Sequence, residues 1–175
     1  MFIRKAMPRF YNVILWILVI VHYMFITSLS ATPADKSAVE SKGVVEIIDS
    51  VSQKVFMKSD VPKDKITQSL HHKRVRKLAH VINYLIFGFL NAMLWFKLSN
   101  KSMHRTTVFT LFFGLCGAIM DETIQLFFDG RSAEVLDVLI DFDGTCLGVG
   151  VFLLLNIAAG IISDFRKEAY RYENV

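Results

Sequence analysis

The sequence predicts an all-α fold, an integral membrane bundle of four transmembrane helices with a short amphipathic helix in the first loop. The 175-residue chain is 53% hydrophobic and contains 15 Phe, and its mean hydropathy is +0.42; these values are typical of membrane proteins. Four apolar stretches are each long enough to supply the roughly 20 helical residues that cross a bilayer core about 30 Å thick. Because hydrocarbon offers no hydrogen-bond partners, each stretch is expected to be a helix.

The first stretch, Phe10 to Ala34, contains no Asp, Glu, Lys or Arg, and residues 10–30 are the predicted first span. Basic residues precede it and small residues follow at 28–31, as in a signal peptide with its cleavage site. The charge-free run is longer than the roughly 7–15 residues of a signal-peptide apolar region. We therefore expect a retained membrane anchor, with the cleaved signal as the alternative.

Residues 31–77 form a polar loop that contains one helical pattern. Its apolar residues recur on one side of a helix; they are Val44, Val45, Ile47, Ile48, Val51 and Val55. This pattern predicts an amphipathic helix in the headgroup layer or across the mouth of the bundle. A solvated loop with one short helix is the alternative.

The predicted core, residues 78–163, contains the other three spans. They are Leu78–Phe96, Thr106–Phe128 and Gly144–Ser163. The last helix is expected to begin earlier, near Val135. The two cysteines, Cys116 and Cys146, lie inside apolar segments at no metal-like spacing and are interpreted as packing residues.

The flanking charges favour a multi-pass protein of the cell membrane with both termini in the cytoplasm. Basic residues in short flanks tend to stay inside, and the first helix usually dominates. Residues 1–9 and the tail 164–175 both carry basic residues and are predicted to be cytoplasmic. The basic cluster between Lys73 and Lys77 lies in the first loop and opposes this orientation.

The third span ends in polar residues. Asp121, Glu122 and Gln125 are three to four residues apart, so a helix directs all three into one sector. A carboxylate at the centre of a bilayer costs roughly 2.5–3.5 kcal/mol, and such residues usually face a protein interior or a wet cavity. We expect the function to be organised around this sector.

Matching polar stripes occur on the neighbouring helices. Lys77, His80, Tyr84 and Asn91 share one face of the second helix. On the fourth, Asp137 and Asp141 share a face with Gly144 and Gly148, a small-residue packing pattern. Antiparallel helices bring these residues to one membrane face, with Arg131 in the last turn as a counter-ion. The candidate polar site is therefore Lys77, His80, Tyr84, Asp121, Glu122, Gln125, Arg131, Asp137 and Asp141.

This cluster has three interpretations: a structural ion-pair network, a divalent-metal or acid–base site, and a recognition cup for a polar headgroup. The sequence contains no Gly-x-Ser-x-Gly, His-Glu-x-x-His or phosphate-binding glycine loop. No catalytic residue, metal ligand or cofactor is assigned from the sequence. Nucleic acid is not an expected partner, because the basic residues flank membrane spans.

The motifs in their order resemble the VanZ-like membrane proteins over most of the chain. The matching segments are Arg76-Lys77-x-x-His80 with Tyr84, Asp121-Glu122-x-x-Gln125 with Gly130-Arg131, and Asp137-x-x-x-Asp141-x-x-Gly144 with Gly148. Two positions depart from the family pattern: Asp129 replaces a usual Pro, and Asp143 a usual apolar residue.

The resemblance implies a protein of the bacterial cell envelope. The namesake proteins are associated with low-level resistance to teicoplanin, a lipoglycopeptide, and no reaction is firmly attached to them. The leading hypothesis is a polar site at the outer membrane face that lowers lipoglycopeptide susceptibility. The alternatives are an enzyme that modifies an envelope lipid or lipid-linked precursor by carboxylate–His chemistry, and a channel subunit assembled as a homo-oligomer through the Gly144–Gly148 face. Expected partners are membrane lipids and a lipid-linked ligand.

Overall fold

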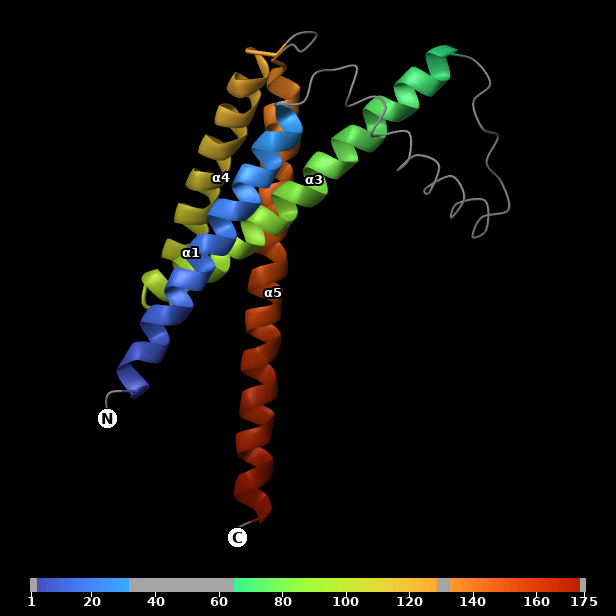
Figure 1. The fold of residues 1–175 in the computed structure, drawn as a ribbon. Helices are drawn as coiled ribbons and strands as arrows, with labels where there is room; N and C mark the ends of the chain where they lie inside the picture. The colour runs from blue at the N-terminus through green and yellow to red at the C-terminus, as the bar shows by residue number, and fades with distance from the viewer. Residues whose placement is uncertain (1–2, 32–64, 129–132, 174–175) are drawn as a thin grey trace.

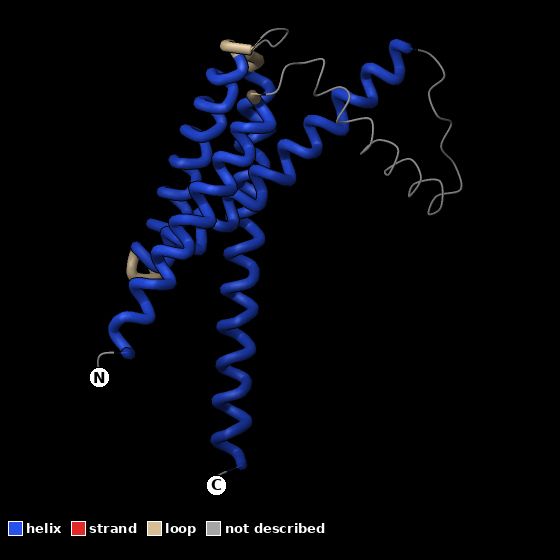
Figure 2. Tube along the Cα trace, viewed as in Figure 1, coloured by secondary structure: helices blue, strands red, loops and turns tan. Residues whose placement is uncertain are grey.

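A computed structural model describes residues 3–31, 65–128 and 133–173. Its four helices are α1 (Ile3–Ser30), α3 (Lys65–Leu98), α4 (Met103–Gln125) and α5 (Val135–Glu173), and the described ranges contain no strand (Figure 2). Each helix includes a segment long and apolar enough to cross a membrane. The protein is therefore a multi-pass membrane protein with four helices in its described ranges that can cross a membrane, which confirms the predicted fold class. The predicted amphipathic helix at 44–55 lies outside the described residues.

The helices form a bundle in which α3 packs most extensively against α5, while α4 contacts both and α1 lies against α3 and α4 (Figure 1). The N-terminal part of α3 extends away from the bundle, and so does the C-terminal half of α5. The last helix thus continues to Glu173, through the segment expected to be a cytoplasmic tail. Both termini lie at the end of the bundle opposite the α4–α5 connection.

Antiparallel α3 and α4 are joined by a tight turn. Asn100 and Lys101 adopt positive φ angles of 53° and 63°, a left-handed conformation that reverses the chain within a few residues. Ser102 then caps α4, because its Oγ accepts a hydrogen bond from the Arg105 backbone N–H at 3.5 Å. The turn brings the second half of α4 back along α3.

In α4 the buried residues are small or polar and the exposed residues are apolar, which is the reverse of a helix in a soluble protein. Its buried residues are small or polar, namely Thr106, Thr110, Gly114, Gly117, Ala118, Asp121, Glu122 and Gln125. Large apolar residues such as Phe112 and Met120 are exposed instead. In a bilayer the exposed Phe and Met face lipid, and small buried residues let helices approach closely. The same arrangement places both α4 carboxylates in the interior.

Close approach between α3 and α5 depends on three glycines, Gly88 on α3 and Gly144 and Gly148 on α5. A Cβ added at Gly148 would collide with the Leu85 carbonyl and lie 2.7 Å from the Phe89 nitrogen, and one at Gly144 would lie 2.6 Å from the Val81 carbonyl. The Gly144–Gly148 face therefore packs against α3 of the same chain. Because α3 covers this face, the packing argues against its use by a second copy, and the homo-oligomer itself stays a prediction.

Candidate functional site

The predicted polar residues that the structure describes gather at one end of the bundle, where α4 ends and α5 begins (Figure 1). α3 contributes residues from the point where it enters the bundle, and α1 contributes its last turn. The outcome follows from antiparallel packing, which brings the end of one helix beside the start of the next. Arg131, the predicted counter-ion in the turn, lies outside the described residues.

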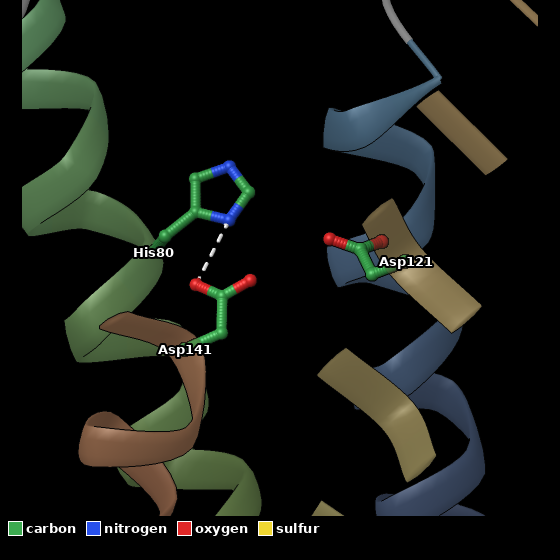
Figure 3. A group of neighbouring side chains, drawn as sticks. All are labelled: His80, Asp121 and Asp141. Atoms are coloured by element: carbon green, nitrogen blue, oxygen red, sulfur yellow. Dashed lines mark ion pairs between the residues drawn. The ribbon is translucent and has the colours of Figure 1, made fainter. Parts of the chain in front are cut away.

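The centre of the site is formed by His80, Asp121 and Asp141, each from a different helix (Figure 3). His80 Nδ1 lies 3.4 Å from Asp141 Oδ1, and one donor atom from each of the three side chains lies within 4.8 Å of the others. Asp121 and Asp141 are 0% and 2% exposed, and the His80 side chain is 17% exposed. Two buried carboxylates thus face one imidazole.

Asp121 is held in place from α1. The Ser30 hydroxyl, itself buried, donates a hydrogen bond of 2.6 Å to Asp121 Oδ2. Asp121 Oδ1 is also buried but has no hydrogen-bond partner among the described residues, and the carboxylate is directed toward the His80–Asp141 pair in Figure 3. One oxygen is therefore fixed and the other is left available to the centre of the site.

Glu122 links the end of α4 to the start of α5. Its Oε1 accepts a hydrogen bond of 2.6 Å from the backbone N–H of Glu134. Glu134 immediately precedes α5, so this contact satisfies one of the backbone donors that every helix leaves free at its N-terminus. The second oxygen, Oε2, is buried and has no hydrogen-bond partner in the described ranges.

A separate ion-pair group lies at the rim. The Lys77 ammonium pairs with Asp137 and lies 3.9 Å from Glu134 Oε2. The side chains of Lys77 and Asp137 are 35% and 21% exposed, so water reaches this pair. Lys77 is thus already occupied by two rim carboxylates.

Beside the centre lies a small cavity of about 10 Å³, room for one water-sized occupant. Its lining combines centre and rim residues: Arg76, Lys77, His80, Gln125, Asp137, Ile140 and Asp141. Gln125, 5% exposed, takes part through this cavity. The lining residues come from α3, α4 and α5, so the cavity depends on their packing.

The polar stripe of α3 divides between two environments. Tyr84 lies one helical turn after His80 on α3 and is fully buried, and its hydroxyl has no hydrogen-bond partner among the residues described. Asn91 lies deeper and donates instead to the Phe87 carbonyl of its own helix at 3.0 Å. Tyr84 therefore belongs to the site, whereas the Asn91 amide is hydrogen-bonded within α3.

The bundle also has an apolar groove between α1, α3 and α4. Its volume is about 220 Å³, and its lining is Trp16, Val19, Ile20, Tyr23, Met24, Phe87, Asn91, Trp95, Phe113, Cys116, Gly117 and Met120. Ile20, Met24 and Met120 are each at least half exposed, so the groove opens on the lipid-facing surface. Gly117 lies one helical turn before Asp121, which brings the groove near the polar site.

Two contributors were missed at the sequence level. The sequence pattern indicates Ser30 only as part of a signal-like segment, and it does not indicate Glu134. A hydroxyl at the last position of the first span, level with the carboxylates of the third, was the available signal for Ser30. For Glu134 the contributing atom is a backbone N–H, which leaves no trace in the side-chain pattern.

The geometry permits three kinds of chemistry. The His80–Asp141 pair resembles an oriented acid–base pair, the three converging donors match a metal-ligand set, and the buried oxygens without partners can accept hydrogen bonds from a polar headgroup. A purely structural network leaves Asp121 Oδ1 and Glu122 Oε2 unsatisfied within the described ranges. Buried unsatisfied acceptors are uncommon in native proteins, which favours a site with an occupant.

Comparison with known protein families identifies a match over most of the chain. The family model described as VanZ/LLP1 matches residues 14–156, which confirms the resemblance seen in the sequence. The matched range covers most of the first span, the second and third spans, part of the fourth, and the polar centre. No curated protein and no solved structure matches the chain.

Proposed function

The chain belongs to the VanZ/LLP1 family, and on that premise we propose that it is a cell-envelope membrane protein that lowers susceptibility to lipoglycopeptides such as teicoplanin. The polar site is the working part, and it acts at the outer membrane face on the headgroup of an envelope lipid or lipid-linked molecule. The observation that carries the proposal is the pair of buried carboxylates, Asp121 and Glu122, each with one oxygen that lacks a partner among the described residues.

Membrane orientation supports an outward-facing site. The site lies at the end of the bundle opposite both termini. The basic residues that precede the first span favour a cytoplasmic N-terminus. With the termini inside, the polar end meets the outer membrane–water boundary, where a membrane-anchored lipoglycopeptide and its lipid-linked target also lie.

The apolar groove supports a lipid as the partner. Its lining is almost wholly apolar, it opens between exposed residues such as Ile20 and Met120, and the bilayer supplies acyl chains at that surface. An acyl chain in the groove brings its headgroup toward the membrane boundary, where Asp121 and Ser30 lie. The apolar groove thus matches the acyl chain of a lipid, and the polar end of the same helices matches its headgroup.

The test is growth inhibition by teicoplanin and vancomycin in a susceptible Gram-positive host at matched membrane levels of protein. Wild type is expected to raise teicoplanin tolerance selectively, because only teicoplanin carries a lipid anchor. Glu122→Gln and Asp121→Asn are expected to remove the effect, while Asp143→Asn, an exposed carboxylate on α5, keeps it. Equal tolerance with and without wild-type protein contradicts the proposal.

A second candidate function rests on the His80–Asp141 pair. An imidazole 3.4 Å from a buried carboxylate, with a second carboxylate across the site, is an arrangement that moves protons in acid–base enzymes. The substrate class is an envelope lipid or lipid-linked precursor. Mass-spectrometric lipid profiles that are identical in cells with wild type and with His80→Gln, in the absence of drug, contradict this activity.

A further inference from the structure

We propose that His80, Asp121 and Asp141 form a binding site for a single first-row divalent cation of the zinc or manganese class. The sequence pattern assigned no metal ligands, because the three residues lie on three different helices and match no local metal motif. The tertiary structure brings one donor atom from each within 4.8 Å of the others. The proposal does not depend on any role in antibiotic resistance.

The spacing of the donors fits a common ion. Two ligands held at roughly 2.0–2.2 Å from one tetrahedral metal ion lie about 3.4 Å apart. His80 Nδ1 and Asp141 Oδ1 are 3.4 Å apart. That distance exceeds the roughly 2.7–3.2 Å of a well-formed N–H···O hydrogen bond. Asp121, whose donor atom lies within 4.8 Å of the other two, is the third ligand of a set with an open fourth position.

An orphaned buried oxygen points independently to a ligand. Asp121 is 0% exposed, and its Oδ1 has no partner within the described part of the chain. Figure 3 shows this carboxylate directed at the His80–Asp141 pair. A buried acceptor without a donor is costly, and a cation between the three side chains removes that cost.

The charges around the site also favour a cation. Lys77 forms its ion pairs with Asp137 and Glu134 at the rim, and no Lys or Arg of the described ranges forms an ion pair with Asp121 or Asp141. Buried charges are stable only when paired or bound to a metal. An imidazole nitrogen with two carboxylate oxygens suits zinc, iron or manganese better than calcium or magnesium.

The site also has the supporting contact that metal centres require. Ser30 holds Asp121 Oδ2 at 2.6 Å, which orients the carboxylate and leaves Oδ1 to face the ion. Metal-binding carboxylates are typically hydrogen-bonded in this way. The neighbouring cavity of about 10 Å³, lined by His80, Asp141 and Gln125 among others, has room for a water molecule on the open coordination position.

The experiment uses the full chain in lipid nanodiscs, stripped with a chelator and then exposed to Zn²⁺. Elemental analysis after gel filtration is expected to find one zinc ion per chain, and a titration of wild type gives the reference affinity. Asp121→Asn and Asp141→Asn are expected to weaken zinc binding by at least about tenfold. Asp143→Asn, with an exposed carboxylate on the same helix as Asp141, is the matched control and keeps wild-type affinity.

A second measurement tests the site in case the Asp121→Asn and Asp141→Asn variants do not fold. Co²⁺ in place of zinc reports coordination through its visible absorption, and wild type is expected to show the bands of a low-coordinate site. His80→Cys keeps a ligand at that position, so it is expected to retain Co²⁺ and gain a thiolate charge-transfer band that wild type lacks. Absence of zinc from wild type, affinities of the Asp variants within twofold of wild type, or no new band in His80→Cys each overturn the proposal.

Discussion

The Ser30 hydroxyl donates a 2.6 Å hydrogen bond to Asp121 Oδ2, which joins the last turn of α1 to the last turn of α4. Both side chains are fully buried. The first span is therefore part of the polar site and not only an anchor. Because Ser30 is the one donor to Asp121 among the described residues, we expect the site to need an intact first helix.

Loss of this hydrogen bond is expected to destabilise the bundle. Ser30→Ala leaves the buried Asp121 carboxylate without its donor, at a cost of about 1–3 kcal/mol. Thermal unfolding in detergent measures the change. Thr27→Val is the control, because the Thr27 hydroxyl donates to the Met24 carbonyl of its own helix in an exposed hydrogen bond of 3.0 Å. An equal loss of stability in both variants contradicts the role given to Ser30.

Substitution by alanine is expected to destabilise the protein at Gly148 but not at Gly150. A Cβ at Gly148 collides with α3 backbone at Leu85 and Phe89, whereas one at Gly150 meets nothing within 4 Å. Gly148→Ala should lose about 1–3 kcal/mol of stability through overpacking. Gly150→Ala should be neutral or gain up to about 1 kcal/mol from helix propensity. Unfolding of both variants in the same detergent tests this; similar effects at the two positions contradict close α3–α5 packing.

The Lys77–Asp137 pair is expected to contribute more than a surface ion pair. Its side chains are 35% and 21% exposed, against 74% and 78% for the Lys167–Asp164 pair of α5. Double-mutant cycles with Met for Lys and Asn for Asp isolate each coupling energy. We expect about 1–2 kcal/mol for the rim pair and less than about 0.5 kcal/mol for the exposed pair. Equal coupling energies for the two pairs would show that water screens them equally, which contradicts the prediction.

The apolar groove is expected to admit acyl chains. Both tryptophans of the chain, Trp16 and Trp95, line it, so lipids with brominated chains should quench their fluorescence. Ile20→Phe should reduce quenching because Ile20 lines the groove. Ile17→Phe should not, since Ile17 is equally exposed on α1, at 53% against 50%, but does not line the groove. Quenching unchanged by Ile20→Phe argues against a chain inside it.

Much of the fold follows from local sequence. The apolar runs predict the four spans because hydrocarbon requires backbone hydrogen bonds within each segment. The three- and four-residue spacings of Asp121, Glu122 and Gln125 predict one buried polar sector, and all three are buried. Antiparallel topology then predicts that the polar residues of α3, α4 and α5 meet at one end.

The sequence by itself thus determined the helices, their membrane character and the end of the bundle at which the polar residues gather, because each depends on period and polarity along the chain. Only the tertiary structure decided which donor pairs with which carboxylate. It paired Lys77 with Asp137, Ser30 with Asp121 and the Glu134 backbone with Glu122, and it left one Asp121 oxygen facing His80 and Asp141. Such pairings depend on helix rotation and separation, which packing at contacts such as Gly148 against Leu85 sets.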